Sequence, residues 1–288
     1  MDRRRGACRF VRLLLRLSLI ALVAAPSLAA GADDSRWTTG VTARSLGFRD
    51  MREPLSFTPS APFIVQHPGW SRDWSEERFY AFARYALVDT DVLSLAPGFH
   101  LGTSVGRFTA RNREQGYYES WETRPAFLWG PSLDLLLRRG RAGGLYFQAR
   151  YELFLAAAPE GSEEVRAASG TATPPSARDA FFSWTSHEVT AAVGHDWGKV
   201  ALAAGLTFTA FRLDKRLTHH IAPSGATGNA LAAILALDAQ ASRYGYEPRS
   251  SLAPYLSATF RPFDRWALEA SLRPAAQPDA ALTLSIGF

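Results

Sequence analysis

The residues best suited to chemistry in this chain are a hydroxyl, an imidazole and a carboxylate in direct succession, Ser186-His187-Glu188. Side chains of these types form nucleophile and base systems when they lie within hydrogen-bonding reach of one another. The sequence around them alternates apolar and polar residues, which predicts a β-strand over 181–195. Neighbouring residues of a strand point to opposite faces, so Ser186 and His187 are not expected to touch. We therefore predict no catalytic residue here.

A second candidate lies where Asp214 precedes His219-His220 in an expected loop. Adjacent histidines without a matching acidic motif define little geometry, so a solvated loop explains them better than a rim site. The sequence contains no HExxH pattern, no paired cysteines, no Asp-rich calcium loop and no glycine fingerprint for phosphates or dinucleotides. We therefore expect neither a metal nor a cofactor.

The elements that position these residues are strands. No stretch after residue 32 approaches the roughly 18 apolar residues of a membrane-spanning helix, whereas alternation with period two recurs along the chain. In Lys199 to Arg212, for example, Val200, Leu202, Leu206 and Phe208 share one face. A soluble sandwich also alternates, but it turns its apolar face inward. The predicted strands are 36–47, 78–88, 92–109, 118–137, 144–156, 181–195, 199–212, 251–262, 266–273 and 280–288.

The connections between these strands alternate strictly in length, which predicts antiparallel strands running up and down with tight turns at one end. Asn229 to Ala241 is apolar and suits a short helix in one long loop. If it were a strand, a second addition at Leu55 to Gln66 would be needed, which would make twelve strands. The short gaps lie near 89–91, 138–143, 196–198 and 263–265, and the mostly longer ones near 48–77, 110–117, 158–180, 213–250 and 274–279.

The last predicted strand places Leu282, Leu284, Ile286 and Phe288 on one face and ends the chain on an aromatic residue. It resembles the closing strand of Gram-negative outer-membrane β-barrels, in which the terminal aromatic helps the barrel assembly machinery to recognise its client. The resemblance implies an all-β, antiparallel, up-and-down transmembrane barrel of about ten strands, with twelve as the alternative. It also implies periplasmic termini, and contact with outer-membrane lipid and with the assembly machinery. Phe288 is the expected assembly signal.

Residues 1–32 have the features of a cleaved signal peptide, with five arginines before an apolar core and small residues near the expected cleavage site. They hold six Arg and one Asp, so 6 − 1 = +5 of charge leaves with them, and the remaining chain has 5 − 5 = 0. A nucleic-acid partner therefore loses its support. Cys8 leaves too, which excludes a disulfide framework. Residues 33–288 then form one outer-membrane barrel domain with long external loops near 48–77, 158–180 and 213–250.

The alternation that turns apolar residues outward turns polar residues into the lumen. If Ala157 lies opposite Phe181, then Arg150 lies opposite Glu188; Glu269 is likewise expected near Arg261. A ten-stranded barrel is narrow, so such charges either fill the interior as an ion-pair network, which we favour, or line a thin selective pore. Two outward residues, Arg107 and His187, break the apolar pattern. The lumen-lining candidates are Arg44, Arg84, His100, Asp134, Arg150, Glu152, Glu188, Arg261, Glu269 and Arg273.

The sequence thus predicts an integral outer-membrane barrel that acts as a narrow channel or as a structural surface barrel. One alternative is a barrel enzyme acting on lipid or peptide at the outer rim, as do outer-membrane phospholipases, lipid A deacylases and omptin proteases. Another alternative is a receptor or adhesin whose long loops bind an external partner. The sequence itself names neither a solute nor such a partner.

Overall fold

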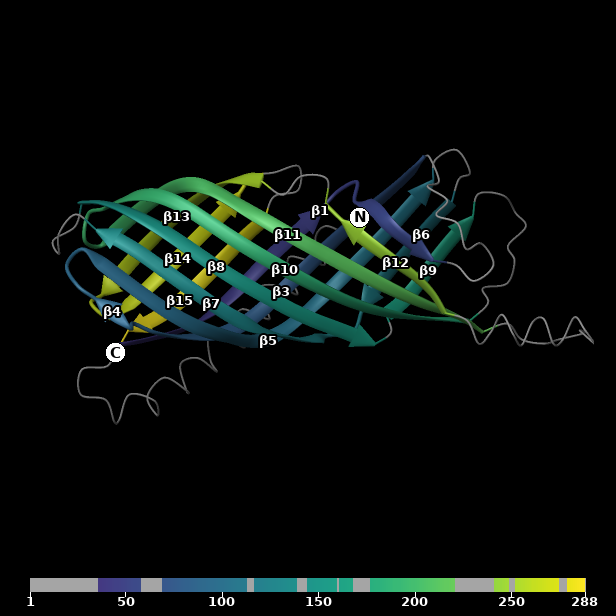
Figure 1. Ribbon diagram of the computed structural model, residues 1–288, viewed down its shortest axis with the longest axis horizontal. Coiled ribbons are helices and arrows are strands. Elements are labelled where there is room, and N and C mark those ends of the chain that lie inside the picture. Colours follow the sequence, from purple (N-terminus) through teal and green to yellow (C-terminus); the bar gives the residue numbers. More distant parts are fainter. Residues whose placement is uncertain are drawn as a thin grey trace, which may run out of the picture.

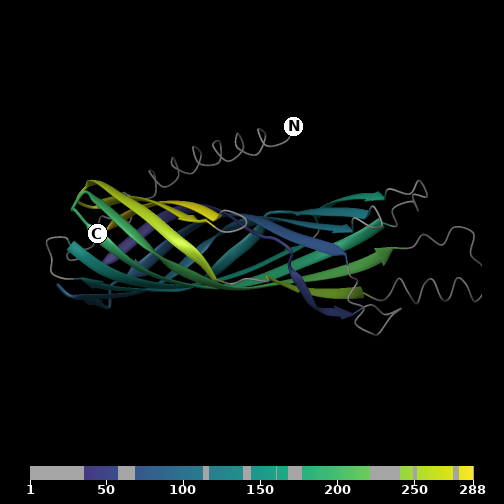
Figure 2. The same cartoon turned by 90° about the horizontal axis from the view of Figure 1, so that it is seen from above.

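A computed structural model shows the chain as a closed antiparallel β-barrel (Figures 1 and 2). The structure describes residues 36–57, 69–112, 117–138, 144–159, 161–167, 177–220, 241–248, 252–274 and 279–287. Within these ranges there is no helix long and apolar enough to span a membrane. The predicted all-β, up-and-down architecture of ten strands is confirmed, and the alternative of twelve is wrong.

Ten long strands form the wall, and each pairs with its neighbours in sequence order. The first and last strands close the ring, with Thr38 opposite Gly287, so the start of β1 and the end of β15 lie at the end with the short turns. The ten are β1 (Trp37–Phe48), β3 (Trp70–Tyr85), β5 (Leu93–Asn112), β7 (Ala126–Arg138), β8 (Gly144–Pro159), β10 (Ala177–Asp196), β11 (Val200–His220), β13 (Leu252–Phe263), β14 (Trp266–Arg273) and β15 (Asp279–Gly287).

Short strands continue the wall at the long-loop end. They are β2 (Arg52–Phe57), β6 (Tyr117–Thr123), β9 (Gly161–Ala167) and β12 (Ala241–Glu247), while β4 (Val88–Asp89) is part of a short turn. Pro125 separates β6 from β7, and Pro248 follows β12, because proline has no N–H for the ladder. The hairpin β14–β15 ends early, and above it β2 pairs with β12. At this end β12 pairs with β11 and β2, and β6 pairs with β5 and β9.

The strands reach further toward the long-loop end than we predicted. β3 begins at Trp70 instead of residue 78, and β11 continues to His220 instead of Arg212. Most of the described residues in the stretches 48–77, 158–180 and 213–250 are therefore in strands. Inward and outward side chains still alternate there, but the large apolar ones now face inward. Trp74 is buried inside, whereas its neighbours Asp73 and Ser75 face outward. The predicted strands were recognised by apolar residues facing outward, so they end where this change occurs.

The two expected extra elements have different outcomes. Leu55 to Phe57 belongs to β2, and the rest of Leu55 to Gln66 lies outside the described residues. The expected short helix over Asn229 to Ala241 also lies outside them, apart from Ala241, which begins β12.

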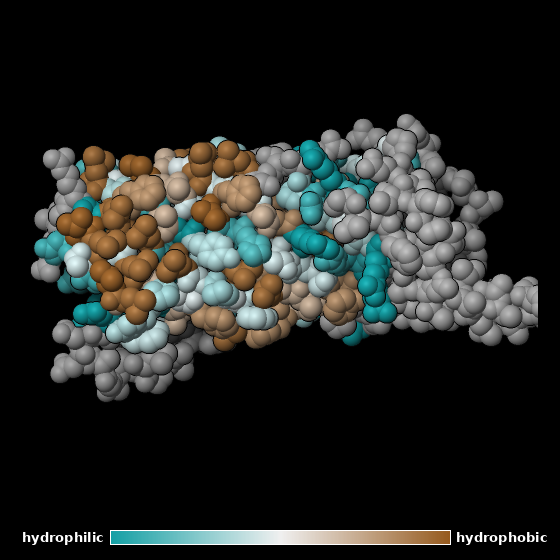
Figure 3. Space-filling model, viewed as in Figure 1, coloured by the Kyte–Doolittle hydropathy of each residue, from teal (hydrophilic) through white to brown (hydrophobic). Residues whose placement is uncertain are grey.

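The outer face has two zones. Near the short turns it is covered by large apolar side chains, brown at the left of Figure 3, which we call the apolar belt. Toward the long loops, polar side chains replace them, as where Arg107 of β5 pairs with Glu122 of β6. The belt includes the exposed side chains Phe99, Leu101, Leu133, Leu137, Leu145, Phe147, Val189, Val193, Leu202, Leu206, Leu256, Leu268, Leu272 and Leu282.

Candidate functional site: the barrel interior

The middle of the interior holds a buried cluster of alternating charges, the central ion cluster (Arg44, Glu76, Arg78, Glu188, Arg273 and Asp279). Glu188 of β10 is 2% exposed and lies among three arginines from across the lumen. Its carboxylate oxygens are 2.7 Å from Arg44 Nη1, 2.8 Å from Arg78 Nη1 and 2.7 Å from Arg273 Nη1. Three arginines thus face three carboxylates, and the cluster is neutral.

The other carboxylates of this cluster are equally well supplied with donors. Arg78 Nε donates to Glu76 at 2.8 Å, and Ser104 Oγ and Trp184 Nε1 donate to the same carboxylate at 2.5 and 2.8 Å. Asp279 accepts from Arg44 at 2.6 and 3.0 Å. Buried charges persist when they are paired and hydrogen-bonded in this way, so the cluster holds five strands of the wall, β1, β3, β10, β14 and β15, to one another.

A second group of charges, the lower ion cluster, lies nearer the short turns. Arg84 and Arg150 both contact Asp134 at 2.7 Å, with Glu152 3.7 Å from Arg84 and Glu269 3.8 Å from Arg150. Between the two clusters lies a polar cavity of about 30 Å³ that Thr42 and Thr190, among others, line. This volume holds about two water molecules and no larger solute.

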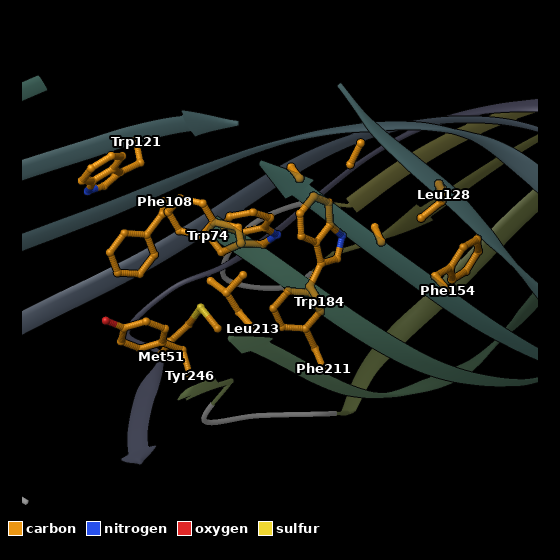
Figure 4. Packing of buried hydrophobic residues seen from close by; sticks show 14 of the residues in the cluster. Met51, Trp74, Phe108, Trp121, Leu128, Phe154, Trp184, Phe211, Leu213 and Tyr246 are labelled. Carbon is orange, nitrogen blue, oxygen red and sulfur yellow. The ribbon is translucent and has the colours of Figure 1, made fainter. Parts of the chain in front are cut away.

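Above the central ion cluster the interior is filled by aromatic rings, the aromatic plug (Trp74, Phe108, Trp121, Phe182, Trp184 and Phe211), most of which Figure 4 shows. Each is at most 3% exposed. The rings of Trp74 and Trp184 meet edge to face at 5.2 Å. The six rings come from β3, β5, β6, β10 and β11, so side chains from both sides of the wall meet inside the barrel.

One ion pair lies within the rings of the plug. Lys215 of β11 pairs with Glu119 of β6, and its Nζ lies 5.0 Å from the Phe108 ring centre and 4.9 Å from that of Trp121. Trp121 Nε1 also donates to Glu119. Nearby, burial and the carboxylates of Glu53 and Glu119 raise the pKa of Tyr246, so its phenol stays protonated.

Nine of the ten sequence-predicted lumen residues lie inside the barrel, in the two ion clusters or beside them. His100 belongs to neither cluster and packs against the rings of Phe154 at 4.2 Å and Tyr80 at 5.3 Å. Arg261 lies at the short-turn end, where its Nη1 donates to Asp196 and to the carbonyl of Gly198. The nine inside are Arg44, Arg84, His100, Asp134, Arg150, Glu152, Glu188, Glu269 and Arg273.

Of the two expected pairings between these residues, one was wrong. Phe181 lies opposite Pro159 rather than Ala157, so Glu188 faces Glu152, and Arg150 faces Thr190. A shift by two residues keeps every side chain on the same face, so alternation cannot detect it. Glu269 lies opposite Thr259, which leaves Arg261 on the diagonal, as expected. The Glu269 carboxylate accepts from Tyr255 Oη at 3.0 Å, and Arg261 pairs with Asp196.

Sequence reasoning missed the residues that close the interior: Glu76, Arg78, Trp74, Lys215 and Glu119. The first three precede or begin the strand we predicted over 78–88, and the other two were not among the lumen candidates. The signal was present, because 70–85 alternates without a break when polar and aromatic residues are allowed to share the inner face.

The residues examined for catalysis do not come together. Ser186 is buried and donates to Glu188 at 3.1 Å, whereas His187 faces outward, with its Nδ1 3.0 Å from Tyr151 Oη. The pairing of β10 is continuous on both sides, so His187 marks no register break. The side chains of His219 and His220 lie outside the described residues, as do Phe288 and residues 1–32. Within the described part of the chain, no group of three acidic, His or Cys side chains could hold a metal ion.

Comparisons with known proteins identify similar barrels only. No protein-family model matches the sequence, and no curated protein matches it either. Among solved structures, the chain is similar to the translocator domain of the autotransporter NalP from Neisseria meningitidis (TM-score 0.39, 11% identity, 98% of each chain covered). It is similar to the Ralstonia pickettii toluene transporter TbuX (0.37, 8%, 89% and 90% covered) and to an outer membrane channel from Pseudomonas putida F1 (0.33, 10%, 90% and 98% covered). With TM-scores below 0.5, none of these likenesses carries an argument about what this chain does.

Proposed function

We propose that this protein is an integral outer-membrane barrel whose lumen is closed, so that it acts as a structural surface barrel rather than as an open channel. The observation that carries the proposal is the filled cross-section. The aromatic plug and the central ion cluster lie one above the other along the interior, and the cavity beneath them has a volume of about 30 Å³.

The membrane location is supported by the two zones of the wall. β14 and β15 have eight and nine residues, close to the roughly 9–11 residues with which a tilted strand spans the hydrocarbon layer. Around β14 and β15 the outer face of the wall is apolar, as contact with lipid requires, and the charged side chains face the interior. In the upper zone the pattern is inverted, with rings inside and charges outside, as water requires. The termini and short turns then lie in the periplasm, and the upper zone stands above the outer leaflet.

A barrel with a closed lumen should not conduct ions. Barrels reconstituted into planar bilayers should show no discrete conductance steps, because no continuous water path crosses the plug. A general porin inserted in the same bilayers serves as the positive control, and heat-modifiable migration on gels checks that this barrel is folded. Steps that disappear when Arg150 and Asp134 are neutralised would contradict the closed lumen and support a thin pore.

We further propose export through a cleaved signal peptide over residues 1–32 and recognition of Phe288 by the barrel assembly machinery. Deleting Phe288 should leave export intact but lower the amount of heat-modifiable barrel in the outer membrane, because the terminal ring is the expected recognition element. Cell fractionation with quantitative blotting measures both steps. Deletion variants that assemble as completely as the unaltered protein would contradict this role of Phe288.

A further inference from the structure

A groove of about 610 Å³ runs across the outer face of the apolar belt, over β10, β11, β13 and β14. Its floor is formed by Ala204, Ala258 and Ala270, and leucines such as Leu202 and Leu256 border it. We call it the alanine groove. Its volume lies within the range of about 300–1,000 Å³ in which proteins bind small ligands.

The register of the strands explains the shape of the groove. His195, Leu202, Ala258 and Ala270 lie opposite one another in succession across four strands. His195 lies just before the turn at 197–199, whereas Ala270 lies midway along β14. Because barrel strands are tilted, this row climbs from the short-turn rim into the middle of the belt. The groove therefore leads from one membrane surface toward the bilayer centre.

The end of the groove at the rim is polar, because His195 lines it there. Its ring packs on the exposed Trp197 at 4.4 Å. Lys199 is exposed in the same turn, whereas Arg261, whose backbone N–H donates to the Lys199 carbonyl, is paired with Asp196.

We propose that the alanine groove binds one phospholipid, with an acyl chain along the alanines and the phosphate at His195 and Lys199. The proposal rests on the membrane location argued above. The apolar floor faces the acyl chains of the bilayer, and tryptophan beside cationic residues is typical of the headgroup layer. The positive charge of Lys199 favours phospholipids with net negative charge.

Native mass spectrometry of the full mature barrel in detergent, with added phosphatidylglycerol, tests the proposal. We expect one retained phosphatidylglycerol per barrel. Ala258→Phe should fill the groove and weaken retention about tenfold or more, which corresponds to about 1.4 kcal/mol. His195→Ala should weaken retention of phosphatidylglycerol more than that of phosphatidylcholine. Ala191→Phe is the matched control, because Ala191 is also exposed on the outer face of β10 but does not line the groove.

Heat-modifiable migration and flotation with liposomes accompany each measurement. A barrel that inserts into liposomes but retains no phosphatidylglycerol, or loses it equally with Ala191→Phe and Ala258→Phe, overturns the groove proposal alone. A folded barrel that does not associate with liposomes overturns the membrane location and the groove together.

Discussion

Replacing Glu188 by glutamine is expected to lower the free energy of unfolding by ~3–5 kcal/mol, the cost of removing one partner of a buried ion pair. The substitution nearly preserves the shape of the side chain but removes its charge. Arg44, Arg78 and Arg273 would then share the two carboxylates that remain, Glu76 and Asp279. Denaturant titration of the barrel in liposomes, followed by tryptophan fluorescence, measures the change.

The matched control makes the same chemical change in an exposed pair. Glu122 accepts from Arg107 at 2.6 Å, but the two side chains are 42% and 59% exposed. Glu122→Gln should therefore lower stability by no more than about 1 kcal/mol. Equal losses for Glu188→Gln and Glu122→Gln would show that the central ion cluster does not hold the wall together.

Replacing Trp184 by alanine is expected to lower the free energy of unfolding by ~3–5 kcal/mol, because it leaves a cavity in a closely packed interior. The change also removes the donor that Trp184 Nε1 supplies to Glu76. The same titration, with fluorescence replaced by circular dichroism, measures the loss. The variant should still show no conductance steps in planar bilayers, because Arg78 and Glu188 still close the lumen beneath the plug.

Trp197→Ala provides the comparison for this second substitution. Trp197 is 61% exposed at the short-turn rim, outside the plug, so its removal should change stability by about 0.5 kcal/mol or less. A Trp184→Ala variant as stable as Trp197→Ala would mean that the plug is not packed as described. Conductance steps in Trp184→Ala alone would mean that the plug, and not the ion cluster, closes the lumen.

Alternation along the chain was enough to predict the number of long strands and the inner and outer faces of the ten predicted segments. Alternation along Lys199 to Arg212 requires a two-sided strand, and the period of two assigns Arg44, Glu152 and Glu188 to the inside wherever that strand is placed. The zero net charge of residues 33–288 and the absence of long apolar runs in them could be read directly from the residue types. These features are local, so each can be seen without knowing which strand lies beside which.

The register and the partners across the lumen could be learned only from the folded barrel. A shift by two residues preserves every face, so alternation could not distinguish Arg150 from Glu152 as the residue opposite Glu188. Nor could it predict that β2 pairs with β12, or that Trp74 and Lys215 are buried above the charges. Ion pairs such as Arg44 with Glu188 join residues 144 positions apart in the sequence (188 − 44 = 144). Such contacts form only when the ring closes, because closure alone determines which strands face each other across the interior.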